Sequence, residues 1–574
     1  MSHTATPAGQ IGRRLPNIWD IAALLCVVGV LVAVAHAARG TFVPLDVLQE
    51  AKIDLDPANL PYYAVRTTMR MFAALGASLL FTFTYAPLAA KSRRAGLIMI
   101  PVLDILQSVP ILGFLTFTTA FFMALFPGRV MGLELAAIFA IFTSQAWNMA
   151  FSFYQSLTTV PADLDEATRG FRLTSWQRFW RLEVPFAMPG LVWNTMLSMS
   201  GGWFFVVASE AISLGDNNWK LPGIGSYVAV ALDQKDFGAV CWAILAMLLV
   251  ILAYDQLLFR PLVAWSAKFR FETTAGATAE DPWVLALLRR THVLRMAGEA
   301  VGSAFAALSG LRLGRPSRVQ GGRRPASLLG NLVFGAIVLA VVAWAVWKIV
   351  DYVSGALHWA DLGETLLLGA ITLLRVVVLM ALAALIWVPI GVWLGLRPAW
   401  ARRVQPLAQF LAAFPANLLF PPFVIVIVYF HLNVDIWLTP LMVLGTQWYI
   451  LFNVIAGAAA FPGDLREAAA NFRVGGLLWW RRVILPGILP YFITGAITAS
   501  GGSWNASIVS EVASWGDDKL AAHGLGAYIA HATDAGNFEQ VVLGVVVMSV
   551  YVLAFNRMLW RPLYAYASRR VTLG

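Results

Sequence analysis

The chain has 574 residues, of which 59% are hydrophobic and 13% are charged, with a net charge of +10. Because a soluble protein carries about twice that charged share, the composition excludes an ordinary soluble enzyme and predicts an all-α polytopic membrane protein. The charge is concentrated at 264–327, where 10 Lys and Arg face 4 Asp and Glu, as in cytoplasmic loops beside anionic lipid, so no nucleic-acid partner is expected. Cys26 and Cys241 lie in apolar runs and are expected to be core residues without a disulfide.

Apolar runs long enough to cross a bilayer as helices predict about 12 transmembrane helices, six in each half. They lie near 18–38, 66–90, 97–126, 132–157, 186–214 and 238–263, and near 328–352, 364–396, 405–430, 436–458, 487–515 and 540–563. The third and ninth runs contain Pro110 and Pro415, so kinks or broken helices are expected there. The first run resembles a signal peptide that ends at Ala35-His36-Ala37, but an uncleaved helix is favoured.

The charged residues between these runs predict an orientation. With the N-terminus inside, every loop on that side carries Lys or Arg, whereas the opposite loops at 215–237 and 516–539 are mainly acidic. The positive-inside rule therefore places both termini in the cytoplasm. The predicted domains are a first half (1–263), a basic cytoplasmic linker (264–327) and a second half (328–574). The linker contains the amphipathic patch Trp283–Arg295 and is expected to be a tether with a short interfacial helix, although a surface helix lying on the membrane is an alternative.

The two halves are copies of one another. Moving residues 161–261 forward by 301 positions aligns them with 462–562 without a gap, and many residues coincide, among them Trp203 with Trp504 and Ser209-Glu210 with Ser510-Glu511. A period of this length indicates a duplicated domain that has been fused head to tail. Two like halves predict a pseudo-twofold arrangement, with the transported substrate near the axis that relates them.

A cytoplasmic loop recurs in each copy. Asp163 with Glu166, and Asp464 with Glu467, have the spacing of a helix capping box. Pro185 and Pro486 are then expected to end the loop helix and begin the next span. The loops could be no more than two capped surface helices, but both carry aromatic residues on the same segment, which favours burial against a partner protein. The aromatic and apolar residues are Trp176, Phe179 and Trp180 in one copy, and Leu478, Trp479 and Trp480 in the other.

At these loops the chain resembles the permease subunits of bacterial ABC importers. The signature of that family is Glu-Ala-Ala, a glycine and a hydrophobic-Leu-Pro ending. Its matches in this chain are Glu166-Ala167-Thr168 with Pro185, and Glu467-Ala468-Ala469 with Pro486. The glycine position is occupied by Arg172 and Arg473, which puts the tight turn between two short helices in question. The resemblance implies a coupling helix that docks on an ATPase subunit.

The resemblance extends over both halves and is closest to the nitrate, sulfonate, taurine and bicarbonate branch, through the segments 372–376, 414–421 and 524–528. It implies a type I importer fold, two separate ATPase subunits that bind ATP and Mg²⁺, an extracytoplasmic solute-binding protein and a small anion as substrate. The chain has no phosphate-binding Gly-x-x-x-x-Gly-Lys motif and no metal motif, so it is expected to be a transport subunit without catalytic residues, cofactor or metal of its own. The alternative is an ion-gradient-driven secondary transporter, because such proteins also have duplicated halves.

Polar residues within the apolar runs are candidates for the substrate pathway, because a charge at a helix centre costs about 2.5–3.5 kcal/mol. Glu210 and Glu511 would lie at the outer water interface if their helices were unbroken, or deeper if the helices broke at Gly201-Gly202 and Gly501-Gly502. The adjoining Ser209, Ser510, Trp203 and Trp504 are further candidates, although close helix packing alone explains the glycine pairs. Polar runs in the same spans favour an aqueous lining: Asn194, Thr195, Ser198 and Ser200, and Thr494, Thr498, Ser500, Ser503 and Asn505.

An arginine in each half gives one further hypothesis. Arg70 and Arg375 align at an offset of 305, where Asp104 faces Gln409. Arg70 could therefore pair with Asp104, whereas Arg375 would lack a carboxylate and could attract an anion. The alternative is that Arg375 bonds to backbone carbonyls or extends outward to the interface. Gln145 and Gln447, each close to a tryptophan on an apolar run, are the remaining pathway candidates.

Overall fold

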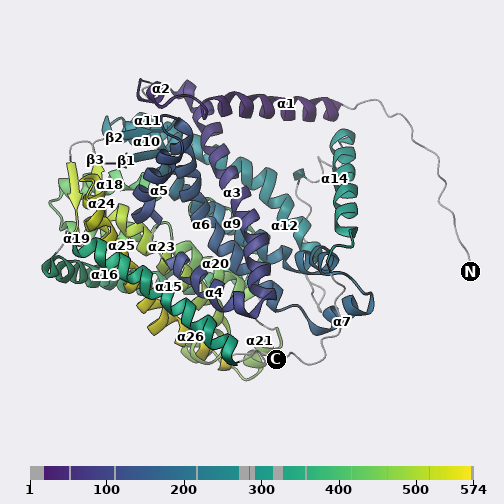
Figure 1. The fold of residues 1–574 in the computed structure, drawn as a ribbon. Coiled ribbons are helices and arrows are strands. Elements are labelled where there is room, and N and C mark those ends of the chain that lie inside the picture. The colour runs from purple at the N-terminus through teal and green to yellow at the C-terminus, as the bar shows by residue number, and fades with distance from the viewer. Residues whose placement is uncertain are drawn as a thin grey trace, which may run out of the picture. The chain divides into compact units, whose positions relative to one another are not determined.

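The computed structural model describes residues 18–50, 53–108, 111–214, 217–269, 283–284, 291–314, 328–355, 358–414, 416–459, 461, 463–515 and 518–570. These residues are mostly helical, with two short antiparallel hairpins (Figure 1). The chain divides into two compact units. The first unit comprises Met1–His36, Val160–Pro189 and Tyr254–Val319, and the second comprises Ala37–Thr159, Gly190–Ala253 and Gln320–Gly574.

The first half is built almost entirely of helices, with one hairpin near its end. The helices before the hairpin are α1 (Ile18–Arg39), α2 (Leu45–Glu50), α3 (Leu60–Lys91), α4 (Arg93–Ser108), α5 (Ile111–Leu125), α6 (Val130–Thr158), α7 (Ala162–Gly170), α8 (Ser175–Arg178) and α9 (Val184–Glu210). They are followed by β1 (Ala211–Leu214), β2 (Asn217–Lys220), α10 (Ile224–Asp233), α11 (Phe237–Tyr254) and α12 (Arg260–Ser266). The linker contributes α14 (His292–Gly310).

The second half begins with α15 (Leu328–Ser354), α16 (Trp359–Gly395), α17 (Pro398–Ala413), α18 (Phe420–Tyr429) and α19 (Val434–Trp437). It continues with α20 (Gln447–Ala459), α21 (Gly463–Asn471), α22 (Gly476–Trp479), α23 (Leu485–Ser510), β3 (Val512–Trp515), β4 (Asp518–Ala521), α24 (Leu525–Asp534), α25 (Phe538–Phe555) and α26 (Arg561–Arg570). Short 3-10 segments occur at Pro57–Asn59, Ala267–Phe269, Ala416–Leu419 and Thr439–Met442.

The duplication is visible in the element bounds. A π-helical segment at Phe179–Glu183 recurs at Trp480–Ile484, and another at Asp255–Phe259 recurs at Asn556–Trp560. The two hairpins, β1–β2 and β3–β4, also begin and end 301 residues apart. Since π-helices are rare and occur mostly as single turns, their recurrence at one spacing confirms the duplication at the level of the backbone.

Among the described residues, nine helices are long and apolar enough to cross a membrane, or ten if the bent pair Val434–Met442 and Gln447–Ala459 counts as one span. This count, which concerns the described residues alone, is consistent with the predicted all-α polytopic membrane protein. Two predicted spans contain interruptions within the described residues: α17 ends at Ala413 and a 3-10 segment follows at Ala416–Leu419, and the pair Val434–Met442 and Gln447–Ala459 is bent by 43°. The first agrees with the break expected in the ninth run, since proline removes a helical hydrogen bond, whereas Pro110 and Pro415 themselves lie outside the described residues.

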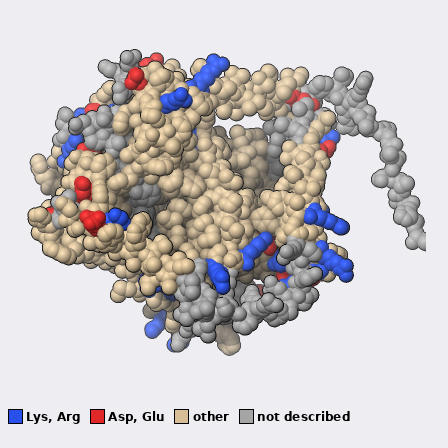
Figure 2. Space-filling view, viewed as in Figure 1, with Lys and Arg blue, Asp and Glu red and all other residues tan. Residues whose placement is uncertain are grey.

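The spans expose apolar side chains to their surroundings. Leu25, Trp344 and Leu385 are exposed on α1, α15 and α16, which is the arrangement that a hydrocarbon environment favours. Figure 2 shows broad uncharged areas on one face, with Lys, Arg, Asp and Glu gathered mainly toward its edges. Cys26 and Cys241 are free and exposed, so the expectation that they are core residues is wrong. A small apolar thiol can face lipid as readily as it can face a core.

The core of the second half is formed by α16, α20, α23 and α25, which pack against one another (Figure 1). Its buried residues include Val376, Ile450, Trp504 and Met548. In the first half, α3 packs along α6, and α5 packs against the same helix. These bundles enclose a small number of buried polar and charged side chains within otherwise apolar surroundings.

Candidate functional site

The repeated loop has the same backbone geometry in both halves. At the end of α7, Leu173 N–H donates to Thr168 O (3.1 Å) and Arg172 N–H donates to Arg169 O (3.0 Å). At the end of α21, Val474 N–H donates to Ala469 O (2.9 Å) and Arg473 N–H donates to Ala470 O (3.0 Å). This is the Schellman pattern, in which the residue after the helix adopts a left-handed conformation.

Arginine occupies that left-handed position in both copies, with φ of 49° at Arg172 and 52° at Arg473. The tight turn between two short helices is thus present without the glycine that the family signature places there. A left-handed conformation costs a residue with a side chain about 1–2 kcal/mol, so both turns carry backbone strain that a glycine would relieve.

The signature residues surround this turn. Glu166, Ala167 and Glu467 are exposed, Ala468 is half-buried, and Thr168 and Ala469 are buried. Thr168 stands where the family signature has alanine. Its hydroxyl is hydrogen-bonded within its own helix, because Oγ1 donates to Asp165 O at 2.7 Å. The buried third position packs the loop helix, whereas the exposed glutamates are available to a partner.

Two local expectations for this loop are wrong. Helix α7 begins at Ala162 with Pro161 as its N-cap, and α21 begins at Gly463, so Asp163 and Asp464 lie inside the first turn and form no capping box. An acidic residue in the first turn still interacts favourably with the helix dipole. The capping box in this loop is instead formed by Thr174 and Gln177 at the start of α8.

Pro185 and Pro486 do not end the loop helices. Both are half-buried near the start of α9 and α23, directly after the π-helical segments. In these segments Val184 N–H donates to Phe179 O, and Leu485 N–H donates to Trp480 O. The extra residue in the π turn shifts the hydrogen-bond register, and the chain therefore continues from the loop helix into the span without stopping at the proline.

The first loop contacts a linker helix within its own unit. Trp176 Nε1 donates to Leu308 O and Gln177 Nε2 donates to Gly310 O, both at 2.8 Å, and the ring of Trp180 meets Phe305 edge-on. Leu308, Gly310 and Phe305 belong to α14, so this helix rests on the first loop. The patch expected at Trp283–Arg295 lies partly outside the described residues, and α14 begins at His292.

The second loop has different side chains at the three positions that bind α14. At the positions 301 residues after Trp176, Gln177 and Trp180 stand Leu477, Leu478 and Arg481. Leu477 and Leu478 are exposed. The two loops thus have equivalent backbones but different surfaces.

A buried ion cluster lies at the end of α9 in the first half. Arg70 donates to Glu210 through Nη1 (2.6 Å) and to Glu134 through Nε and Nη2 (2.6 and 2.7 Å). Arg66 donates to Glu134 as well. All four side chains are buried, and three helices, α3, α6 and α9, are joined by their charges.

The second half contains a related cluster. Arg375 donates to Glu511 through Nη1 (3.1 Å) and to Asp435 through Nη2 (2.9 Å). His523 closes the cluster, because its backbone N–H donates to Asp435 Oδ1 (2.7 Å) and its Nδ1 lies 3.0 Å from Oδ2. Asp435 is 38% exposed, so this cluster is more open to solvent than the first one.

Each buried glutamate is wrapped by a Gly-x-Gly segment. Glu210 Oε2 accepts from Gly225 N–H (2.7 Å) and Oε1 accepts from Thr67 Oγ1 (2.7 Å). Glu511 accepts from Ala527 N–H (3.1 Å) and Thr372 Oγ1 (2.9 Å). A Cβ atom at Gly223 or Gly524 would come within 2.3 or 2.2 Å of the carboxylate oxygen, so glycine is required for this close approach.

These clusters correct the charge hypotheses. Arg375 has two carboxylate partners, so the expectation that it lacks a matching carboxylate is wrong. Glu511 stands just before the hairpin β3–β4 and Asp435 lies in the short helix α19, whereas the expectation compared only the position that corresponds to Asp104. The side chains of Asp104 and Gln409 lie outside the described residues. Helices α9 and α23 continue through their glycine pairs, so no break occurs there. Glu210 and Glu511 are nevertheless buried, because the hairpins and α10 and α24 fold back over the helix ends.

The other pathway candidates lie around these clusters and spans. Ser209 and Ser510 are buried, as are Trp203 and Trp504. Trp504 stacks on Tyr551 with ring centroids 6.4 Å apart. Gln145 Nε2 lies 3.5 Å from Met199 Sδ, and Gln447 Oε1 accepts from Trp387 Nε1 at 2.8 Å.

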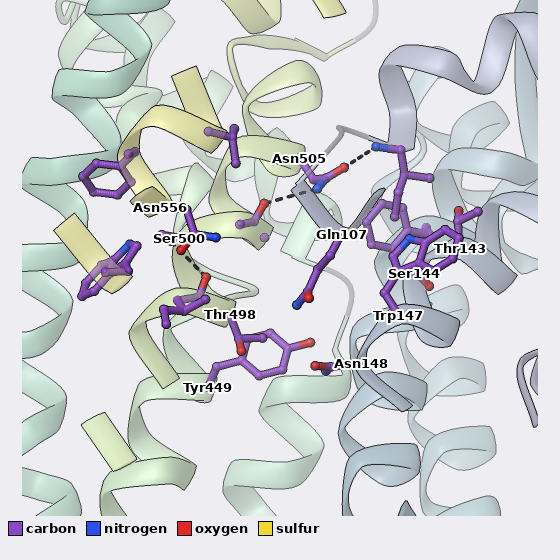
Figure 3. Close-up of a pocket in the computed structure, with 18 residues that line it drawn as sticks. Gln107, Thr143, Ser144, Trp147, Asn148, Tyr449, Thr498, Ser500, Asn505 and Asn556 are labelled. Carbon is purple, nitrogen blue, oxygen red and sulfur yellow. Dashed lines mark hydrogen bonds between the residues drawn. The ribbon is translucent and has the colours of Figure 1, made fainter. Parts of the chain in front are cut away.

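A polar cavity of about 120 Å³ lies between helices of the two halves (Figure 3). The first half contributes Gln107, Thr143, Ser144 and Asn148, together with Ile111, Trp147 and Phe205. The second half contributes Tyr449, Thr498, Ser500, Asn505 and Asn556, together with Ile497, Gly501, Gly502, Val552, Phe555 and Trp560. Asn505 joins the halves, because its Oδ1 accepts from Ile111 N–H at 2.5 Å.

Part of this lining comes from the predicted polar runs. Thr498, Ser500 and Asn505 line the cavity, and Ser200 lines a smaller adjoining one of about 70 Å³. Ser503 instead bonds to Thr446, and Asn194 bonds to Ser152. The cavity lining does not include the nine individual pathway candidates, which are Glu210, Glu511, Ser209, Ser510, Trp203, Trp504, Arg375, Gln145 and Gln447.

Other residues of the site were not predicted from the sequence. Glu134 and Asp435, which stand 301 residues apart in apolar surroundings, were missed although their spacing matches the duplication. Gln107, Asn148 and Tyr449 were also missed. The sequence contains one indication for Asn148 and Tyr449: each follows a tryptophan, and the two pairs stand 301 residues apart.

The fold and the cavity define a duplicated, polytopic membrane protein with a polar chamber between its halves. The family described as "binding-protein-dependent transport system inner membrane component" matches residues 63–259 and 387–571, one copy in each half. These matches cover more than half of the chain, which therefore belongs to this family.

Individual relatives match over about a third of the chain. The bicarbonate transport system permease protein CmpB of Synechococcus elongatus is 29% identical over 186 residues, which cover 32% of this chain and 64% of that protein. The nitrate import permease protein NrtB of Leptolyngbya laminosa is 25% identical, covering 33% and 63%. The glycine betaine/carnitine transport permease protein GbuB of Listeria monocytogenes is 29% identical, covering 33% and 63%. The chain thus spans a little under two thirds of the length of these relatives.

Replacing the central arginine of the first cluster is expected to destabilise the protein strongly. Arg70→Met leaves Glu134 and Glu210 buried with less compensating charge, which lowers the free energy of unfolding by about 3–5 kcal/mol. Denaturant unfolding in detergent micelles measures this change. The control is Lys220→Met, which breaks the exposed Lys220–Asp233 pair and costs about 0–1 kcal/mol. Equal losses in the two variants would contradict the assigned role of the cluster.

Glycine at the left-handed position is expected to stabilise the second loop. Arg473→Gly relieves the strained φ and slows amide hydrogen exchange at Val474, consistent with a gain of about 0.5–1 kcal/mol. In the control, Arg466→Gly within α21 costs about 1 kcal/mol and accelerates exchange. A gain in neither variant would show that the turn carries no strain.

Removing the contacts to α14 is expected to release the linker helix. The double variant Trp176→Phe and Gln177→Leu loses both hydrogen bonds to α14 as well as the capping-box bond of Gln177, and trypsin cleavage at Arg312 should accelerate about tenfold. The matched variant Leu477→Ala and Leu478→Ala changes the same positions of the second loop and should leave the cleavage rate unchanged. Identical rates in both double variants and the unaltered protein would refute the contact.

Proposed function

We propose that this chain is the transmembrane permease of an ATP-binding-cassette importer, in which two separate ATPase subunits bind the loops at α7–α8 and α21–α22. The observation that carries this proposal is the repeated loop: an exposed glutamate, a Schellman turn and a π-helical connection into a span, at the same positions of both family-matched regions. Because both loops have the same backbone geometry, they suit two ATPase subunits of the same kind.

An exposed aromatic residue precedes the arginine turn in each loop. Phe171 is 79% exposed and Phe472, which stands 301 residues later, is 83% exposed. A phenylalanine at the tip of a polar turn gains little from water, and partner surfaces commonly bury such anchors. These two side chains are therefore the proposed contact points with the ATPases.

The proposed substrate is a small anion, delivered by an extracytoplasmic solute-binding protein. The support comes from the polar cavity between the halves and from the relatives named for bicarbonate and nitrate. ATP hydrolysis in the partner subunits would rock the two halves and expose the cavity to each side in turn. The proposed location is a bacterial inner membrane with both termini in the cytoplasm, as the distribution of Lys and Arg predicts.

A secondary transporter driven by an ion gradient is the rival proposal. Coupling to protons or cations generally uses an ionisable residue on the pathway. The described residues that line the cavity include no Asp, Glu, His, Lys or Arg, and the described carboxylates Glu134, Glu210 and Glu511 are held by arginines. This arrangement favours an external energy source such as ATP.

The double variant Phe171→Asp and Phe472→Asp is expected to lose the ATPases. Charge at both contact points should prevent co-purification of the partner subunits and reduce ATP-dependent uptake in vesicles at least tenfold, while the chain remains folded. The control is Phe42→Asp, which changes an exposed phenylalanine outside the loops. Uptake that continues without bound ATPase would favour the gradient-driven rival.

A further inference from the structure

The chemistry of the cavity lining is neutral but not uniform. The serine and threonine hydroxyl groups of the lining already donate their hydrogens within their own helices. Thr143 donates to Ala140 O (2.9 Å), Ser144 to Ile141 O (2.6 Å), Thr498 to Thr494 O (3.1 Å) and Ser500 to Ile497 O (3.0 Å). A hydroxyl that donates to its own helix retains its oxygen lone pairs. These four side chains therefore present hydrogen-bond acceptors to the cavity.

Three other side chains supply donors. The amides of Gln107 and Asn148 and the hydroxyl of Tyr449 line the cavity and form no side-chain hydrogen bond within the described part of the chain. Figure 3 shows them directed toward the same part of the cavity, with Thr498 beside Tyr449. Each amide offers two N–H groups and the phenol offers one O–H.

Two of the donors come from equivalent places in the two halves. Asn148 and Tyr449 each follow a tryptophan and stand 301 residues apart. They line the cavity from α6 and α20, and Gln107 lines it from the end of α4. A site near the axis that relates two halves is where a transported solute is expected.

The size of the cavity limits its occupant. A cavity of about 150 Å³ holds benzene, which has six heavy atoms, so the present cavity of about 120 Å³ suits a solute of about five heavy atoms. Planar oxyanions of three oxygens fit this limit. Glycine betaine, with eight heavy atoms, exceeds it.

The described residues of the lining carry no charge, which limits the valence of the occupant. Neutral dipoles can replace part of the water around a single negative charge, but the cost of removing a second charge from water rises steeply without a counter-charge. A monovalent anion can therefore enter and leave, whereas sulfate is excluded. Weak binding by neutral donors also permits release, which transport requires.

We propose that this cavity is a binding site for one monovalent oxyanion that retains an O–H group, the chemistry of bicarbonate. Gln107, Asn148 and Tyr449 donate to the anionic oxygens, and hydroxyl oxygens such as that of Thr498 accept from the O–H. This inference rests on the proposed transport function and deepens it by assigning the site and the substrate class. Nitrate has the same size and charge but no hydrogen to donate, so it leaves the acceptors unmatched.

The test measures binding directly, without ATP. The full chain in lipid nanodiscs broadens the ¹³C resonance of labelled bicarbonate, and nitrate, sulfate and glycine betaine compete in separate samples. Bicarbonate is expected to bind about three- to tenfold more tightly than nitrate, the effect of one neutral hydrogen bond. Sulfate and glycine betaine should not compete. Stronger binding of nitrate, sulfate or betaine would overturn the proposal.

Two variants separate the donor and acceptor sides. Tyr449→Phe removes one donor and should weaken both bicarbonate and nitrate about three- to tenfold, whereas Thr498→Val removes one acceptor and should weaken only bicarbonate. The control Tyr429→Phe changes an exposed tyrosine and should alter neither. Gln107→Leu replaces Tyr449→Phe as the donor variant if the latter melts at a lower temperature. Unchanged bicarbonate binding in both donor and acceptor variants would refute the site.

The result is independent of the test of the partners. If the unaltered chain did not co-purify with ATPase subunits but still bound bicarbonate, the proposed importer function would fail and the assigned binding site would stand. Conversely, an importer that binds its ATPases but shows no bicarbonate broadening would retain the proposed function and lose this inference.

Discussion

A buried arginine that holds carboxylates from other elements is the constraint on which each half depends. In an apolar surrounding neither Arg70 nor Glu210 could remain charged alone, so α3, α6 and α9 must meet at one point. The carboxylate of the same glutamate accepts from Gly225 N–H and its backbone carbonyl accepts from Ser226 Oγ, which holds α10 back over the end of the span. Arg375 and Glu511 impose the same arrangement on the second half. Charge neutralisation thus fixes the frame around which the apolar helices pack.

Within this common frame the two copies have diverged in their surfaces and in their cavity residues. Glu134 corresponds to the half-exposed Asp435 with its His523 partner, and Asn148 corresponds to Tyr449. The first loop holds α14 through Trp176 and Gln177, whereas the second loop exposes leucines at those positions. A duplicated scaffold can keep its backbone and still build an asymmetric chamber and two different docking surfaces, because neither feature contributes to the ion clusters.

Local pattern was sufficient for some features and insufficient for others. The prolines of the ninth run predicted the interruption that follows Ala413, because proline acts on its own helix. The same reasoning failed at Pro185 and Pro486, because a π-helical turn before each proline lets the helix continue past a residue that has no N–H donor. It also failed at Gly201-Gly202, where α9 continues without a break. The capping box was misplaced for a similar reason: Pro161 allowed the helix to begin earlier than the spacing suggested. The partners of Arg375 could not be found, because Asp435 and Glu511 are distant in the sequence and aligned with no expected register.

The sequence by itself determined the class of protein, the duplication, the repeated loops and the approximate spans, because these follow from hydrophobic length, spacing and charge that neighbouring residues carry. The tertiary structure alone decided which charges meet, which polar side chains face the cavity and which of them remain free to donate. Those facts depend on how helices far apart in the sequence are rotated and placed, such as α6 and α20, which both line the cavity, and α3 and α9, which Arg70 and Glu210 join. A hydrogen-bond inventory can be completed only when every neighbour of each polar group is known.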